Sequence, residues 1–503
     1  MMSKRIRFAL AAIAISLALF AGLSQPSASS SFSAESLRPL RLCGECFTPA
    51  AAQQTAARNA ALIAATQDVL KETSAIRQLS ILRPVQSSAQ SRAEIERALI
   101  KSLDEDTTPA SIHADEVTLK KLGLAPADFQ YRALMLRVLT EQVAGYYDPK
   151  TRQFHLADWI DLDGQKPIMA HELTHALQDQ HFNLRRFEHW PKGDSDAELA
   201  AHALIEGDAT LAMALYVANN PLVALAFLKS LGAAGMASAE LDKAPRALRE
   251  SLLFPYQDGE KWVSALYKRG GWNEVSQAFT TLPQSTEQIL HPEKYFAHEA
   301  PVKVTLPDVT NLLSGSRAEV RDQRSEVRGR RSVRGLSSLI LQPSSFRRNS
   351  SLVTHHSSPS GAWRRVAYDV QGEWGFYLIL DQFLKSPAES HRAAAGWGGD
   401  RFAVYEGPQG EILIASLSVW DTENDAREFF DAYVKRIELR YPNAAPLGSS
   451  SPLPFALSPQ AEVLRSWKTS EGNVTVEIRG LRVRVIEGIP DRVDSNLLLK
   501  SAW

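Results

Sequence analysis

Residues 167–178 read PIMAHELTHALQ, an instance of H-E-x-x-H in an apolar sequence that favours a helix. Residues four apart lie on one face of an α-helix, so His171 and His175 can present two imidazoles to one metal ion. Glu172 follows the first histidine, where its carboxylate can reach a water molecule beside that ion. Two neutral nitrogens, one carboxylate base and an open position for water are typical of zinc hydrolases. The sequence therefore predicts a helix that binds Zn²⁺ through His171 and His175, with Glu172 as the general base.

A third protein ligand is needed, and the sequence offers two candidates. Glu206 lies in a second helix-favouring segment, residues 197–210, and would complete a site of two histidines and one glutamate. His181 instead lies where the metzincin pattern places its third histidine, but that pattern has glycine where this chain has Gln178. Without a turn at Gln178, a continuing helix would point His181 about 240° away from His175. We therefore prefer Glu206, and we expect Gly207 beside it to let the two metal-bearing helices approach closely.

Three further residues are candidates for supporting roles. His202 lies one helical turn before Glu206 and is expected to support the ligands. Asp179 lies four residues after His175, so it either orients that imidazole or caps the helix. A zinc peptidase also needs a donor that stabilises the oxyanion, and His291 is our candidate, with a structural helix end as the alternative.

Three sequence runs resemble a known group of enzymes. HELTHALQDQHF at 171–182, ALIEGDAT at 203–210 and STEQILHPEKY at 285–295 are similar to a group of secreted bacterial and archaeal metallopeptidases, which looks like a branch of the gluzincins. The resemblance extends over roughly residues 125–310 and includes GWGGDR at 396–401.

The gluzincin resemblance implies a zincin-like catalytic domain with the ligands and base named above. It also implies that a strand just upstream of the metal helix holds the substrate backbone by strand addition. Many gluzincins have an aspartate four residues after the third ligand, whereas this chain has Thr210 there and Asp208 only two residues on. We expect Asp208 to point away from the site.

The N-terminus indicates export. Residues 1–24 have three basic residues followed by an apolar run and small residues, which is the layout of a signal peptide; an uncleaved anchor is the alternative. We expect the body of the protein to be periplasmic, cell-surface or extracellular, with no other membrane span. The only cysteines, Cys43 and Cys46, could then form a short-loop disulfide.

Composition limits the partners. The net charge of −1 over 503 residues does not suggest nucleic acid, so the expected partner is a peptide or protein substrate. The predicted regions follow composition and periodicity: an N-terminal helical region, a zincin-like catalytic domain, a disordered Arg/Ser-rich insertion and a C-terminal α+β region, at 25–124, 125–313, 314–360 and 361–503.

The predicted fold class is α+β and mostly α. We expect a small edge sheet from a strand–turn–strand unit at 143–156, two metal-bearing helices, and a smaller α+β region after them. In that later region, residues 396–401 are expected to form a tight turn in which Asp400 pairs with Arg401.

The sequence thus predicts a secreted zinc-dependent peptidase. Two alternatives remain open: an exported protein whose zinc site only stabilises it or binds a partner, and a metzincin-type peptidase that uses His181.

Overall fold

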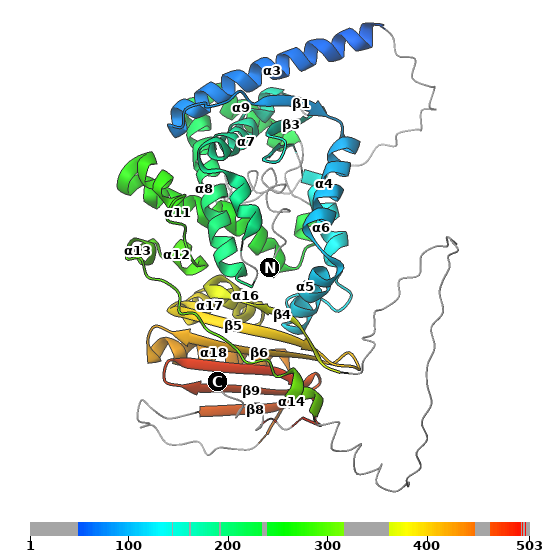
Figure 1. Cartoon of the computed structure of the whole chain (residues 1–503), viewed down its shortest axis with the longest axis vertical. Helices are drawn as coiled ribbons and strands as arrows, with labels where there is room; N and C mark the ends of the chain where they lie inside the picture. Colours follow the sequence, from blue (N-terminus) through cyan, green and yellow to red (C-terminus); the bar gives the residue numbers. More distant parts are fainter. Residues whose placement is uncertain are drawn as a thin grey trace, which may run out of the picture.

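The computed structural model describes residues 49–142, 144–159, 162–190, 193–233, 239–315, 362–447 and 463–493, together with residues 495 and 498. The predicted signal peptide, both cysteines and nearly all of the predicted insertion lie outside these residues. A mostly helical part is joined to a C-terminal sheet part, as Figure 1 shows. The predicted α+β class is confirmed.

The described residues between 49 and 296 form the helical part. Its helices are α3 (Pro49–Arg77), α4 (Arg92–Asp106), α5 (Pro109–Lys121), α6 (Tyr131–Gln142), α7 (Leu162–Phe182), the 3₁₀ helix η1 (Leu184–His189), α8 (Ser195–Asn219), α9 (Pro221–Ala233), α10 (Ala239–Asp242), α11 (Arg246–Ala278), α12 (Thr286–Leu290) and α13 (Pro292–Phe296). A further helix, α14 (Thr310–Gly315), lies against the C-terminal sheet. A capping box of Ser91 and Glu94 begins α4. Gly270 and Gly271 kink α11, since both have non-helical backbone angles.

A three-stranded sheet lies beside α7. Its strands are β1 (Gln86–Gln90), β2 (Gly145–Asp148) and β3 (Gln153–Ala157), in the order β1-β3-β2. The predicted strand–turn–strand unit is confirmed as the antiparallel pair β2–β3. The sequence did not indicate β1, because QSSAQ lacks the β-branched and aromatic residues that favour strands. Its parallel pairing with β3 also ties the N-terminal region to the sheet beside the metal helix.

Helices α7 and α8 run through the middle of the helical part (Figure 1). Both carry buried residues on all sides, because α3 and α9 also pack against α7 and α11 packs against α8. Gly207 allows a close helix approach, but the neighbour is α11 rather than α7: a Cβ at Gly207 would lie 2.3 Å from the backbone of Gly259. Our expectation that Gly207 brings the two metal-bearing helices together is therefore wrong.

The C-terminal part is a seven-stranded antiparallel sheet with three helices. In spatial order, its strands are β4 (Arg364–Asp369), β5 (Trp397–Glu406), β6 (Ile412–Trp420), β10 (Arg482–Ile489), β9 (Gly472–Arg479), β8 (Val463–Thr469) and β7 (Ala445–Pro446). Its helices are α16 (Gly372–Leu384), α17 (Pro387–Ala394) and α18 (Glu423–Arg440).

The two faces of this sheet have different partners. Phe402 and Val404 lie in the large core that the helices share, whereas Ala403 and Tyr405 pack with residues 304–313 on the opposite face. The large core runs from Ile95 in α4 to Val485 in β10. The helical and sheet parts therefore share one continuous hydrophobic core.

The predicted tight turn at 396–401 is wrong, because β5 begins at Trp397. Asp400 does not pair with Arg401. Its carboxylate accepts hydrogen bonds from the backbone N–H groups of Gln371 and Gly372 and from Trp397 Nε1. Arg401 donates to the carbonyl of Val304 at 3.3 Å instead.

Among the described residues, none of the helices meets the length and hydropathy expected of a membrane span by itself. Residues 195–219 and 221–229 of α8 and α9 meet that criterion only as a pair, which bends by 109°.

Candidate metal centre

The structure brings the predicted ligands His171, His175 and Glu206 together at one point. Nε2 of His171 and Nε2 of His175 lie 3.1 Å apart, and Glu206 Oε2 lies 3.2 Å from the first and 3.3 Å from the second. Helix α7 supplies both histidines from successive turns, and α8 supplies the glutamate. His171 and Glu206 are fully buried, and His175 is nearly so.

These spacings can be compared with those of a zinc site. Tetrahedral zinc with ligand bonds of about 2.0–2.1 Å places neighbouring ligand atoms about 3.3–3.4 Å apart. The three observed distances agree with this spacing, so one ion fits among the three atoms. The residue types also suit zinc, which accepts imidazole nitrogen and carboxylate oxygen.

Glu172 lies beside this group, and its two oxygens have different surroundings. Its carboxylate and the ring nitrogens of His171 and His175 all lie within 4.8 Å of one another. The backbone N–H of Tyr147 in β2 donates to Glu172 Oε2 at 2.8 Å. Oε1 is buried and has no hydrogen-bond partner among the described residues. Strand β2 therefore orients the carboxylate and leaves one oxygen for a ligand or a water molecule.

A chain of hydrogen bonds orients His175. Its Nδ1 lies 2.9 Å from Gln178 Oε1, and Gln178 Nε2 donates to the carbonyl of Ile205 at 3.0 Å and to Asp208 Oδ2 at 2.9 Å. The Ile205 carbonyl and the Asp208 carboxylate are both acceptors, so the amide nitrogen of Gln178 must face them. The amide oxygen of Gln178 therefore faces His175. Nδ1 of His175 must then carry a proton, so Nε2 is the nitrogen that would bind a metal, in exchange for any proton of its own.

This chain continues to the N-terminal helix. Arg77 in α3 donates to Asp208 Oδ1 at 2.5 Å, and both side chains are fully buried. The Arg77 guanidinium also lies 4.5 Å from the ring centre of Trp272. Asp208 thus supports the site through Gln178, and our expectation that it points elsewhere is wrong. The sequence pattern around Gln178 suggested only that the residue would not turn the helix.

Asp179 does not orient His175. Its carboxylate accepts from the Tyr147 hydroxyl at 3.0 Å and from the backbone N–H of Leu184 at 3.1 Å, just past the end of α7. Leu184 is the first residue of η1, so Asp179 bonds to the start of the next helix, and neither the orientation of His175 nor a cap on α7 describes its contacts. His202 Nε2 lies 3.7 Å from Glu206 Oε1, close to the site but beyond hydrogen-bond length.

Burial and mutual charge shift the pKa values in the cluster. Burial lowers the pKa of His171 to about 4 and raises that of Glu172 to about 8. Burial also opposes charge on His175, but the Glu206 carboxylate outweighs it and raises that pKa to about 9. Burial alone would raise the pKa of Glu206, yet the two histidines hold it well below its usual range.

Tyr256 of α11 is a residue that sequence reasoning missed. Its ring centre lies 6.2 Å from that of His171, and the side chain is buried. Burial, with the nearby carboxylates of Glu206 and Glu172, raises the pKa of Tyr256 well above its usual value, so the phenol stays protonated. The sequence around Tyr256 contains no motif that indicates a role. Tyr256 reaches the site because α11 and α8 pack closely at Gly207 and Gly259.

His291 and His181 have other partners. His291 Nε2 lies 2.9 Å from Glu373 Oε1 at the start of α16, and its backbone ends α12 and begins α13. His181 Nε2 lies 2.8 Å from the carbonyl of Ser80. Helix α7 continues to Phe182 without the turn that the metzincin pattern needs. No contact of the described residues joins either histidine to Glu206.

A second acidic group, Glu287, Glu299 and Asp421, also has metal-like spacing. The ammonium group of Lys294 bonds to all three carboxylates, at 2.7 Å to Glu287 and 2.8 Å to Glu299. A lysine thus already supplies the positive charge there.

The start of α8 is attached to the sheet part. The backbone N–H of Ser195 donates to Asp369 at the end of β4, at 2.8 Å. Asp196 accepts from the backbone N–H of Thr286 at 3.0 Å and from its hydroxyl at 2.5 Å. The backbone N–H of Trp374 in α16 donates in turn to the Thr286 hydroxyl. The helix that carries Glu206 is therefore held at its first turn by α12 and by the C-terminal part.

Comparisons with known proteins bear only on the C-terminal part. A family model described as a domain of unknown function (DUF8575) matches residues 361–497. This range begins where the predicted C-terminal region begins, and it contains neither the predicted zinc ligands His171, His175 and Glu206 nor Glu172. Neither the curated proteins nor the solved structures yielded a match.

Proposed function

We propose that this chain is an exported zinc-dependent peptidase of the gluzincin type. His171, His175 and Glu206 would hold the ion, and Glu172 would be the general base. The observation that carries the proposal is the spacing of 3.1–3.3 Å among the three ligand atoms, beside a carboxylate with one oriented and one open oxygen. Export rests on the signal-like residues 1–24.

Each residue has a distinct task in this proposal. Zinc, when bound, supplies Lewis acidity toward water and the scissile carbonyl. Glu172 accepts the proton of the attacking water at Oε1 and then passes it to the leaving amine. The N–H of Tyr147 holds Oε2, so the carboxylate keeps its direction during both transfers. Tyr256 is a protonated donor beside the cluster, and it replaces His291 as our candidate for stabilising the oxyanion.

The small sheet suggests where the substrate lies. Strand β2 is an edge strand, and its residue Tyr147 contacts Glu172 directly. A peptide that added to this edge as a further strand would pass beside the Glu172 carboxylate.

The two alternatives have less support. A zinc site that only stabilises the fold usually has four protein ligands and needs no base, whereas Glu172 keeps an oxygen available. A metzincin-type site would need His181 near the other ligands, but His181 bonds to Ser80.

Metal analysis and peptide-library digestion of four purified proteins test the proposal. We expect the wild type to bind one zinc ion and to cleave peptides. Glu172→Gln should keep zinc and lose activity by about 10²–10⁴-fold, since it removes the proton acceptor. Glu206→Ala should lose most zinc affinity, and His181→Ala should resemble the wild type.

Two results would overturn this proposal. Zinc retained in Glu206→Ala and lost in His181→Ala would favour the metzincin alternative. Stoichiometric zinc without cleavage of any peptide, and without effect of Glu172→Gln on any property, would favour a non-catalytic zinc protein.

A further inference from the structure

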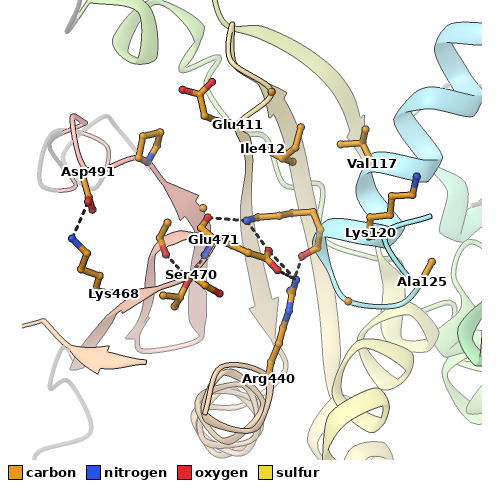
Figure 2. A pocket seen from close by; sticks show the side chains of 18 of the residues that line it. Val117, Lys120, Ala125, Glu411, Ile412, Arg440, Lys468, Ser470, Glu471 and Asp491 are labelled. Carbon is orange, nitrogen blue, oxygen red and sulfur yellow. Dashed lines mark hydrogen bonds and ion pairs between the residues drawn. The ribbon is translucent and has the colours of Figure 1, made fainter. Parts of the chain in front are cut away.

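A pocket of about 840 Å³ lies where α5 meets the C-terminal sheet, and its lining includes none of the predicted zinc ligands. One wall comes from α5 and the loop after it, including Val117 and Ala125. The opposite wall comes from the β8–β9 turn with Glu471 and from the end of α18 with Arg440. Figure 2 shows Arg440 and Glu471 joined by dashed lines at the base, with Val117 and Ile412 beyond them. The volume falls within the range of small-molecule sites.

A network of charged side chains forms the base of this pocket. Lys121 Nζ lies 3.1 Å from Glu471 Oε2, and Arg440 Nη2 lies 3.0 Å from the same oxygen. Behind them, Glu487 Oε2 accepts from Arg440 at 3.2 Å, and its Oε1 accepts from Arg436 at 2.5 Å. Arg436 and Glu487 are fully buried, Lys121 and Arg440 are each 6% exposed, and only Glu471, at 43%, reaches solvent substantially.

This network is not electrically balanced. Lys121, Arg436 and Arg440 carry three positive charges, whereas Glu471 and Glu487 carry two negative charges. The charged residues at the rim pair separately: Lys468 with Asp491, Glu411 with Arg492, and Lys120 with Glu116. One positive charge is therefore left over where Lys121 and Arg440 line the pocket. Burial lowers the pKa of Lys121, and the nearby Arg440 guanidinium lowers it further, whereas Glu471 and Glu487 raise it.

We propose that this pocket binds a small organic carboxylate with an apolar body, against Lys121 and Arg440. One carboxylate would balance the network. Glu471 shows the type of contact, because its own carboxylate is bound by Lys121, Arg440 and the Tyr441 hydroxyl at 3.0–3.2 Å. Val117, Phe383 and Ile412 supply apolar surface for the rest of the ligand. A peptide C-terminus and a fatty acid share this chemistry.

Ligand-observed NMR on the full zinc-loaded chain tests the site with matched probes. N-acetyl-leucine represents a peptide C-terminus and hexanoate a fatty acid, with N-acetyl-leucinamide and hexanamide as uncharged controls. We expect at least one carboxylate to bind with a dissociation constant on the order of 1 mM, and its amide to bind at least about tenfold more weakly. The probe that binds identifies the source of the carboxylate.

Two variants locate the binding. Glu471→Gln raises the surplus to two charges and should tighten carboxylate binding about tenfold. Lys121→Met removes the surplus, so binding should weaken at least about tenfold while the melting temperature is kept or raised, because two arginines then balance two glutamates. The proposal is overturned by equal binding of acids and amides, by no response to Glu471→Gln, or by unchanged binding in Lys121→Met. The last result would place the carboxylate elsewhere, for example at the metal centre.

Discussion

At the scale of single residues, Gln178 decides how His175 is presented to a metal. Its amide donates to Ile205 and Asp208, so its carbonyl must accept from the imidazole. A carboxylate commonly has this role beside metal-bound histidines. In this protein Gln178 lies between the imidazole and the carboxylate of Asp208. Asp208 orients the Gln178 amide, and that amide orients His175. The Asp208 contact with Arg77 keeps that carboxylate in place.

We predict that Gln178→Leu lowers zinc affinity about 10–100-fold, because Nδ1 of His175 loses its acceptor while the residue volume is nearly kept. Competition with a chromophoric chelator measures this. Gln180→Leu is the matched control: Gln180 lies on the same helix, and its side-chain bonds within the described residues go to the backbone of Leu82 and Arg83. Equal affinity loss in both variants would assign the effect to α7 stability instead.

At the scale of elements, the crossing of α8 and α11 positions Tyr256. Glycines face each other there: a Cβ at Gly207 would meet the Gly259 backbone, and one at Gly259 would meet the carbonyl of Ala203, each at 2.3 Å. Gly259 lies one turn after Tyr256, so both residues are on the face of α11 that packs against α8. The close packing therefore places the phenol beside the predicted zinc ligands. Only a pair of helices without side chains at this point can approach so closely.

We predict that Gly207→Ala destabilises the protein by about 1–3 kcal/mol, because the new methyl group forces the two backbones apart. Tyr256 would move with α11, so peptidase activity should fall more than zinc content does. Gly375→Ala in α16 is the control, since the atoms nearest to its new Cβ belong to the side chain of Gln371, the closest at 3.1 Å. That variant should be neutral or slightly more stable in chemical denaturation; if Gly207→Ala behaved in the same way, the crossing would not be tight.

At the scale of the whole molecule, buried carboxyl groups from both parts, Asp196 of α8 and Asp400 of β5, lie on either side of Gly372 where the helical and sheet parts meet. Asp400 accepts from the start of α16, and burial raises its pKa to about 7. Arg401 beside it lowers that pKa, whereas burial, with Asp400 among the nearby carboxyl groups, raises the pKa of Asp196 at the start of α8 well above its usual value. The carboxyl in the unfolded chain has a pKa of about 3.9.

We predict that Asp400 makes the protein less stable as pH rises from about 4 to about 7. The folded state binds this proton more tightly than the unfolded state, so the contribution is complete below pH 4 and is lost as pH rises through 7. Asp400→Asn removes this part of the pH dependence, and melting temperatures across this range measure it. Asp104→Asn, at a position whose side chain is 55% exposed, should keep the wild-type slope. A wild-type slope in Asp400→Asn would contradict the prediction.

The sequence by itself determined the elements that depend on local pattern. H-E-x-x-H on an apolar helix indicated His171, Glu172 and His175, and the strand–turn–strand pattern at 143–156 indicated β2 and β3. These features follow from helical and strand periods and from local backbone preferences, which neighbouring residues carry. The choice of Glu206 over His181 also came from a local argument, the lack of a turn at Gln178.

Only the tertiary structure decided which distant residues meet. Three contacts join segments that have no periodic or spacing signal in common. They are the hydrogen bonds from Gln178 through Asp208 to Arg77, the Tyr256 phenol beside Glu206, and the pairing of β1 with β3. The same holds for Asp400, which looked like half of a local ion pair but accepts backbone hydrogen bonds at the start of another helix. Such contacts depend on how helices and strands cross in space, and a single sequence does not encode those crossings in any local pattern.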